Sequence, residues 1–131
     1  MMEKKNITNE KLMDFAKDAA KKAYAPYSGF AVGAALLTLS GKIYTGCNVE
    51  NASYGASVCA ERIAVFKAVS EGERIFRKIA IYTSGGSGSP CGICRQVLSE
   101  FSSDMTLLYH DSQGIIKEVP LSKMIPDAFN M

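Results

Sequence analysis

The chain has 131 residues, of which 47% are hydrophobic and 21% charged; this length and composition are typical of one domain and argue against a disordered chain. The 15 Lys and Arg residues exceed the 13 Asp and Glu residues so slightly that the net charge is +2, which argues against a strongly basic surface for binding nucleic acid. We therefore expect residues 1–131 to form a single domain without a nucleic-acid partner.

The chain also lacks the apolar segments of membrane proteins and exported proteins. Its longest nearly apolar run, residues 30–39, falls well short of the roughly 20 residues of a membrane span. The polar N-terminal sequence has no apolar core of the signal-peptide kind. We therefore expect a cytoplasmic protein with no membrane partner, in a compartment where cysteines stay reduced.

The first half of the chain predicts a helix followed by a hairpin. Apolar residues at helical spacing indicate an amphipathic helix over residues 8–24. Residues 30–39 and 42–49 are typical of strands, and the short connection Ser40-Gly41 between them is of the hairpin type. We expect these two strands to pair antiparallel.

A second helix and a third strand follow. The helix is expected over residues 57–71, with Gly72 as its stop signal. Its buried side is expected to carry four apolar residues, Ile63, Ala64, Phe66 and Val69. Residues 78–83 predict a short apolar strand. The Gly- and Ser-rich segment 84–89 is interpreted as a plain connection, because no Gly-Lys-Ser/Thr follows it as in a phosphate loop.

The last third of the chain predicts one more helix and two strands. The helix is expected over residues 90–101 with Ser89 as its cap. Strands are expected over residues 105–110 and 115–119. The tail holds at most one short helix near Pro126.

This order of elements, α-β-β-α-β-α-β-β, predicts an α/β fold. It contains two β-α-β crossovers, which require parallel strands with right-handed connections. We expect three layers, in which helices cover both faces of a mixed five-stranded sheet. Ligands of such sheets bind beyond the carboxyl ends of the strands, where the loops leaving the second and third strands lead to Cys59 and to the pair Cys91 and Cys94.

Three of the four cysteines have the position and spacing of metal ligands. Cys91 and Cys94 lie three positions apart in the first turn of a helix, where one metal ion can bridge them. Cys59 lies near the start of the preceding helix. Helix N-termini favour negative charge, and the thiolate is the form that binds zinc. A redox-active CxxC pair is the alternative, although it requires neither a third thiol nor a nearby acid.

A set of three thiolates also suggests catalysis at the metal. Three protein ligands leave a fourth tetrahedral position for water, whereas structural zinc sites are closed by four ligands. In the alternative, a structural site, Cys47 or the only histidine, His110, closes the shell. We expect instead that Cys47 packs as a small apolar residue and that His110 is a polar group at a strand end.

Two charged residues stand close behind Cys59. Glu61 is the candidate to move protons at the metal-bound water, the alternative being a solvated charge on the helix surface. Two positions along a regular helix turn through about 200°, so Cys59 and Glu61 are not expected to share a helix face. Zinc with three thiolates carries excess negative charge, which Arg62 is expected to offset by donating hydrogen bonds to a ligand sulfur, unless it is a surface arginine.

The sequence resembles the zinc-dependent nucleoside deaminases, and among them the small cytidine deaminases. Cys-Ala-Glu at 59–61 followed by Pro-Cys-Gly-Ile-Cys at 90–94 is similar to the zinc deaminase signature. The segments FAVGAAL (30–36), NVEN (48–51) and CGICRQ (91–96) resemble the cytidine deaminases specifically. The common signature begins with His; the cysteine found here is similar to the three-cysteine, homotetrameric branch.

The resemblance implies a reaction and a cofactor. It implies one zinc ion per subunit, bound by Cys59, Cys91 and Cys94, and hydrolytic deamination of cytidine and 2′-deoxycytidine in pyrimidine salvage. Zinc-bound hydroxide would attack C4 of cytosine while Glu61 protonates N3 and then carries a proton to the departing amino group, which yields uridine or 2′-deoxyuridine plus ammonia. The resemblance also implies a homotetramer whose pockets are completed by neighbouring subunits.

The same resemblance assigns substrate contacts. It places Phe30 against the pyrimidine, Asn48 and Glu50 on the ribose hydroxyls and the backbone of Ala60 on the base. Three further residues are similar to those that reach a neighbouring subunit's pocket: Ala52, Tyr54 and Phe129.

Chemistry supports some of these contacts and leaves alternatives open. A carboxylate accepts hydrogen bonds from sugar hydroxyls and repels a nearby phosphate, so Glu50 should favour nucleosides over nucleotides. Phe30 offers a stacking face to a base, whereas hydrogen bonds to the polar edge discriminate cytosine. Core packing remains the alternative for Phe30, and a turn after a strand remains the alternative for Asn48 and Glu50.

Other functions also stay open. A cytosine-containing antibiotic or cytosine in RNA would require the same zinc chemistry. The NVEN segment argues against the antibiotic, and the small net charge argues against RNA. A nonenzymatic zinc module closed by Cys47 is the alternative from another class.

Overall fold

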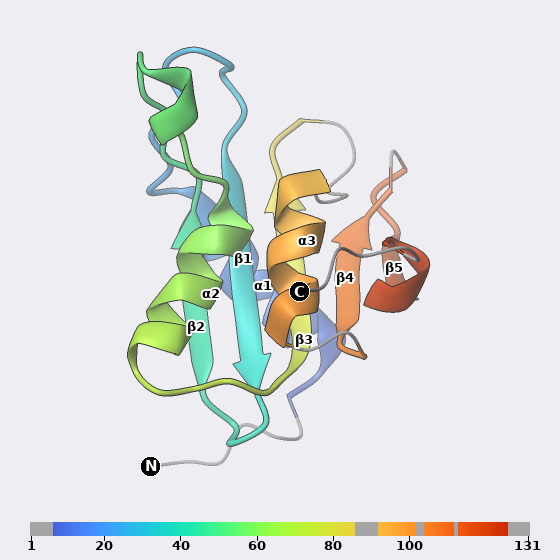
Figure 1. Cartoon of the computed structure of the whole chain (residues 1–131). Coiled ribbons are helices and arrows are strands. Elements are labelled where there is room, and N and C mark those ends of the chain that lie inside the picture. The colour runs from blue at the N-terminus through green and yellow to red at the C-terminus, as the bar shows by residue number, and fades with distance from the viewer. Residues whose placement is uncertain (1–6, 86–91, 102–103, 112, 126–131) are drawn as a thin grey trace.

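A mixed five-stranded sheet forms the centre of the computed structural model, which describes residues 7–85, 92–101, 104–111 and 113–125 (Figure 1). The sheet order is β2-β1-β3-β4-β5. The strands are β1 (Val32–Thr38), β2 (Ile43–Cys47), β3 (Phe76–Thr83), β4 (Thr106–His110) and β5 (Ile116–Pro120). β1 is antiparallel to β2 and β3, β3 is parallel to β4, and β5 is antiparallel to β4. The predicted mixed sheet and its antiparallel hairpin are confirmed.

Helices cover both faces of this sheet, as the element order predicts. α1 (Asn9–Ala20) lies on one face, and α2 (Ala60–Ser70) and α3 (Gly92–Phe101) lie side by side on the other (Figure 1). Two short 3₁₀ helices, η1 (Tyr54–Ala56) and η2 (Leu121–Lys123), complete the described elements. Within the described ranges, no helix has both the length and the apolar character required to cross a membrane.

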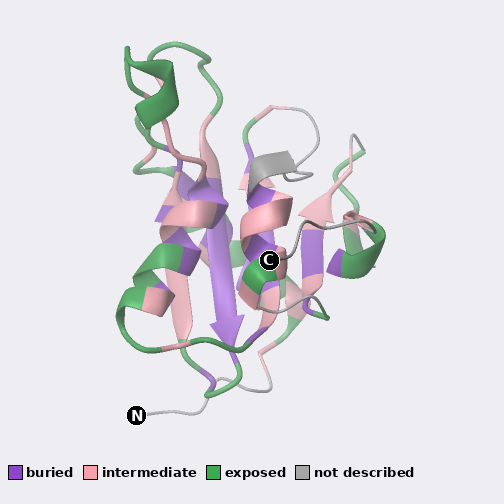
Figure 2. Ribbon diagram, in the orientation of Figure 1, coloured by how far each residue is buried: buried purple, intermediate pink, exposed green. Residues whose placement is uncertain are grey.

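Strand β1 contributes side chains to a hydrophobic core on each face. Ala34 and Leu36 pack in the core beneath α2 and α3, whereas Ala35 and Leu37 pack in the core beneath α1. All four are buried, and Figure 2 shows β1 buried along most of its length. The uninterrupted apolar run of this strand is explained by its central position, because both of its faces are covered.

The face that α2 buries agrees with the prediction at Ala64 but not at Phe66. Ala60 and Ala64 are fully buried, whereas Phe66 is 47% exposed and the other two expected residues are only partly buried. The helix runs very close to β2: a Cβ atom at Gly46 would lie 2.6 Å from the Ala60 carbonyl oxygen and 2.7 Å from the Ala64 backbone nitrogen. The same Cβ atom would lie 2.9 Å from the Ile63 Cβ atom, so only glycine leaves room for this approach of the helix.

Two helices are shorter than predicted because their ends pair with a loop. α1 ends at Ala20, and the backbone of Tyr24 instead forms a β-bridge with Val49. α2 begins at Ala60, because Val58 pairs with Val49 as well. These long-range bridges draw the chain into one loop cluster and override the local helical pattern.

Parts of the predicted elements lie outside the described residues. α3 is described from Gly92 onward, so the predicted cap Ser89 and the first helical residue Pro90 fall outside. The same holds for most of the 84–89 connection and for the tail near Pro126.

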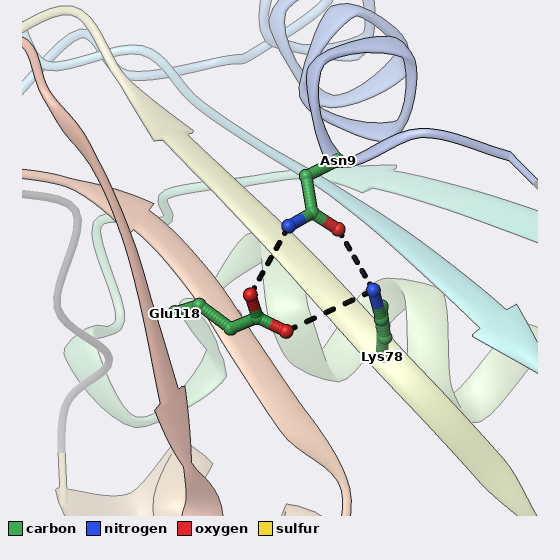
Figure 3. A network of polar contacts seen from close by, with 3 residues as sticks. All are labelled: Asn9, Lys78 and Glu118. Atoms are coloured by element: carbon green, nitrogen blue, oxygen red, sulfur yellow. Dashed lines mark hydrogen bonds and ion pairs between the residues drawn. The ribbon is translucent and has the colours of Figure 1, made fainter.

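A polar network ties α1 to two strands on its face of the sheet (Figure 3). The Lys78 ammonium of β3 donates to the side-chain oxygen of Asn9 at 2.8 Å, and the Asn9 amide donates to the Glu118 carboxylate of β5 at 3.3 Å. Lys78 and Glu118 form an ion pair at 3.9 Å. Because the ion pair is partly exposed, we expect it to contribute at most about 1 kcal/mol; the network mainly orients the start of α1.

Candidate active site

The carboxyl ends of β2 and β3 and the N-termini of α2 and α3 lie at the same end of the molecule (Figure 1). Cys59 is the N-cap residue of α2 and is half-buried. Cys94 lies in the first turn of α3 and is fully buried. Both thiols are thus placed at helix N-termini, where the positive end of the helix dipole stabilises a thiolate.

Glu61 lies in the first turn of α2, and only 4% of it is exposed. Burial raises the pKa of this carboxyl group to about 7, although a hydrogen bond from its own backbone N–H opposes the rise. The charge of Cys59 adds to the rise, and a hydrogen bond with the Cys94 side chain reduces it. The alternative of a solvated surface charge is therefore wrong, because the carboxyl group is enclosed beside both thiols.

The charge of Cys59 raises the pKa of Glu61, although the spacing of the two residues predicted different helix faces. The 200° argument holds only for two residues of a regular helix. Cys59 has an extended backbone, with φ −75° and ψ 155°, and only caps the helix. The two side chains can therefore meet at the open end of α2.

Arg62 interacts with the side chains of Cys59 and Cys94. Its Nη2 atom donates to the Cys59 Sγ at 3.8 Å and to the Ser57 carbonyl oxygen at 3.4 Å. Burial lowers the pKa of the guanidinium, but the hydrogen bonds and charges of Cys59 and Cys94 outweigh this effect and raise the pKa above its usual value. The predicted hydrogen bond from Arg62 to the Cys59 sulfur is therefore present in the structure.

The N-termini of α2 and α3 form a corner of the molecule whose donor atoms fit zinc. Arg62 interacts with both Cys59 and Cys94, so one guanidinium group spans two thiols of the kind that zinc prefers. Its Nε atom is buried and has no hydrogen-bond acceptor among the described residues, which leaves a donor for a further anionic group. Cys91, the third predicted ligand, lies outside these residues, within which no three metal-binding side chains form a cluster.

Cys47 lies on the opposite face of the sheet from these groups. It stands directly across from Gly33 in the antiparallel β1–β2 pair, and directly opposed residues project from the same face. A Cβ atom at Gly33 would lie only 1.9 Å from the Ala16 carbonyl oxygen of α1. Cys47 therefore faces α1, and the sheet separates it from the thiols beneath α2 and α3.

His110 is separated from the thiols in the same way. It pairs with Ile116, which packs in the core beneath α1. The His110 ring also lies 5.3 Å from the Tyr82 ring, and its Nε2 atom accepts a long hydrogen bond of 3.4 Å from the Thr83 backbone N–H. Its placement agrees with a polar group at a strand end and gives no support to a fourth metal ligand.

A hollow of about 430 Å³ opens beside this corner. Six residues line it: Tyr27, Ser28, Glu50, Asn51, Tyr54 and Ser57. Glu50 Oε1 accepts the backbone N–H groups of Tyr27 and Ser28 at 2.9 and 3.1 Å, and Oε2 accepts the Ser28 hydroxyl at 2.5 Å. The Ser28 hydroxyl is the main cause that lowers the pKa of Glu50. The carboxylate is thus held in one orientation at the hollow.

Asn48 and Phe30 are coupled at the entry to β1. The buried Asn48 side chain accepts the Val32 N–H at 2.9 Å through Oδ1 and donates to the Phe30 carbonyl at 2.9 Å through Nδ2. One amide hydrogen of Asn48 thereby stays available to another acceptor. The Phe30 side chain is 55% exposed, so core packing does not account for it.

The other predicted substrate residues differ in their surroundings. Ala60 is the first residue of α2 and is fully buried; backbone N–H groups at this position have no acceptor within a helix. Ala52 and Tyr54 are exposed, Tyr54 to 83%, on the η1 loop that protrudes at this end (Figure 2). Phe129 lies outside the described residues.

Sequence reasoning missed Ser28, the residue that holds Glu50. Its hydroxyl contacts the carboxylate across 22 positions of the chain. A serine in a turn carries no periodic signal, so no local pattern could have indicated this pairing.

The sequence of the chain is similar to those of known proteins. The model of the cytidine and deoxycytidylate deaminase zinc-binding region matches residues 6–110. A cytidine deaminase of Sporosarcina psychrophila is 48% identical over 123 residues, which cover 92% of this chain and 90% of the relative. A probable cytidine deaminase of Dictyostelium discoideum is 42% identical over 92% of this chain and 83% of the relative.

A solved structure has the same fold as this chain. The crystal structure of cytidine deaminase from Burkholderia pseudomallei matches with a TM-score of 0.88 and 46% identity, over 94% of this chain and 100% of that one. The fold, the zinc-binding region and the level of identity together assign the chain to one family of hydrolytic enzymes. The chain belongs to the cytidine deaminase family.

Proposed function

We propose that this enzyme deaminates free cytidine and 2′-deoxycytidine, with water, to uridine or 2′-deoxyuridine and ammonia, as a single-domain cytoplasmic enzyme of pyrimidine salvage. The observation that carries the proposal is the buried Glu61 carboxyl group beside Cys59 and Cys94 at two helix N-termini. We place the enzyme in a reducing compartment, where cysteines stay available to bind a metal.

Each group in this corner has a distinct task. Cys59, Cys91 and Cys94 would hold one zinc ion per subunit, which would supply Lewis-acid activation of water. Glu61 takes the proton released by the attacking water and delivers it to N3 of cytosine. It then carries the second proton to the amino group, which leaves as ammonia. Enclosure of the carboxyl group keeps these transfers away from bulk water.

The hollow at Glu50 supports a nucleoside as the substrate. In the ordered Glu50 carboxylate, Oε1 accepts two backbone N–H groups and Oε2 accepts the Ser28 hydroxyl, so Oε2 keeps one lone pair for a sugar hydroxyl. The exposed ring of Phe30 offers a stacking surface to the base, and Asn48 and the backbone of Ala60 contribute polar contacts. A phosphate close to Glu50 would meet like charge.

We also propose that the enzyme is a homotetramer whose pockets are completed by Ala52, Tyr54 and Phe129 of neighbouring subunits. Exposed large side chains support this assembly, because a single chain leaves Tyr27 and Tyr54, which line the hollow, and also Phe30 more than half exposed.

A substrate panel tests the proposal. The zinc-loaded enzyme should turn over cytidine and 2′-deoxycytidine, measured as loss of cytosine absorbance, with kcat/KM at least about tenfold lower for cytidine monophosphates and no turnover of a cytosine-containing oligoribonucleotide. The active species should have the mass of four chains in solution. Equal turnover of the oligonucleotide, or full activity of a monomer, would contradict the respective part of the proposal.

The contact between Arg62 and Cys59 makes a further prediction. Arg62→Ala removes a hydrogen bond to a ligand sulfur, so we expect zinc affinity or kcat to fall by about 10- to 100-fold, as for other residues that support metal ligands. Zinc content and kcat should be measured on the same preparation. Full activity with zinc bound would show that Arg62 has no such role.

A further inference from the structure

We infer that Gly85, at the exit of β3, positions the Phe30 ring and thereby sets the affinity of the enzyme for its nucleoside. The inference rests on the proposed function, in which this ring stacks on the pyrimidine. It adds a positioning residue that sequence reasoning had placed in a plain connection.

The backbone on both sides of Phe30 is held in place. Its N–H donates to the Ser28 hydroxyl at 3.1 Å, and its carbonyl accepts the Asn48 amide at 2.9 Å. The next residue, Ala31, pairs twice with Ser84: its N–H donates to the Ser84 hydroxyl at 3.0 Å, and its carbonyl accepts the Ser84 N–H at 2.9 Å. The residue that follows Phe30 is therefore tied directly to the residue that precedes Gly85.

The ring itself is less restrained than its backbone. More than half of the Phe30 side chain is exposed, so packing in the core does not define its orientation. Gly85 bounds it on one side: a Cβ atom at Gly85 would lie 2.5 Å from Cε1 and 2.6 Å from Cδ1 of the ring. Carbon atoms do not approach so closely, so any side chain at this position would displace the ring.

Gly85 cannot readily retreat from such a collision. The buried Thr83 hydroxyl donates to the Gly85 carbonyl at 3.1 Å and accepts the Gly85 N–H at 3.3 Å. With the glycine tied to a buried side chain, the exposed ring is the group that moves. Rotation of an exposed ring costs the fold little but removes the ring from its stacking position.

A double-mutant cycle on the full-length, zinc-loaded enzyme tests this. Phe30→Ala should raise the KM for cytidine and the Kd for uridine about tenfold, the value of one base–aromatic contact. Gly85→Ala should raise both about fivefold with kcat within about twofold of the parent, because it disturbs stacking and not proton transfer. In the Phe30→Ala background, Gly85→Ala should change neither constant, because the atoms that it meets are gone.

Nuclear Overhauser effects between the Gly85 Hα atoms and the Phe30 ring protons supply a readout that needs no nucleoside. We expect these effects in the parent enzyme, in which the ring borders Gly85. Their absence, an unchanged KM in Gly85→Ala, or an equal loss with and without the Phe30 ring would overturn the inference while cytidine turnover by the parent upheld the proposed function. A parent that keeps these contacts but neither binds uridine nor converts cytidine would refute the proposed function and, with it, the assigned role of Gly85.

Discussion

Replacing Glu61 with Gln should lower kcat for cytidine by about 10³-fold, the scale of a lost general acid and base. The carboxyl group is buried beside Cys59 and Cys94, so no bulk water can replace its proton transfers. Glutamine has nearly the same shape but neither accepts nor releases a proton at neutral pH. Loss of cytosine absorbance in matched preparations measures the effect.

The zinc content of the Glu61→Gln variant must equal that of the parent, because only then does the lost rate report on proton transfer. Glu71→Gln is a matched control: it changes the same residue type at the other, exposed end of α2 and should leave kcat unchanged. A Glu61→Gln variant that kept a tenth of the parental kcat with zinc bound would contradict the assigned role.

Cys59→Ser should weaken zinc binding by more than about 100-fold, since changing a residue that merely supports a ligand already costs 10- to 100-fold. Activity should fall in parallel. The serine hydroxyl is a poor zinc ligand, yet serine is a favoured N-cap residue, so the start of α2 should not be weakened. Metal analysis and circular dichroism of the same sample separate loss of zinc from loss of fold.

Cys47→Ala is the matched control for this prediction. Cys47 faces α1 across the sheet from the predicted ligands, so this variant should keep its zinc and its activity. Loss of zinc from Cys47→Ala together with its retention by Cys59→Ser would favour a structural zinc module closed by Cys47 and would refute the proposed active site.

The sequence predicted the architecture because its signals are local. Apolar runs bounded by turn residues, such as the hairpin at Ser40-Gly41, indicated the strands, and the alternation of strands and helices indicated the crossovers. The same order placed Cys59 and Cys94 at one end of the sheet, because loops that leave parallel strands open at the same edge. The reaction was inferred from the resemblance to the cytidine deaminases, because the periodicity of a sequence carries no information about chemistry.

Other features depend on residues that are distant in the chain, so local patterns could not predict them. The close approach of α2 to Gly46 joins two segments that are distant in the chain, so the local pattern of the helix could not predict it. Strand register placed Cys47 on the far side of the sheet.

The order of the helices and strands and the residue types at their ends could thus be predicted from the sequence, because short-range periodicity and capping encode these properties. The three-dimensional packing alone decided that Glu61 is enclosed, that Ser28 orients Glu50 and that Gly85 borders Phe30. Burial, hydrogen bonding and steric exclusion of this kind arise between segments that only the folded chain brings together.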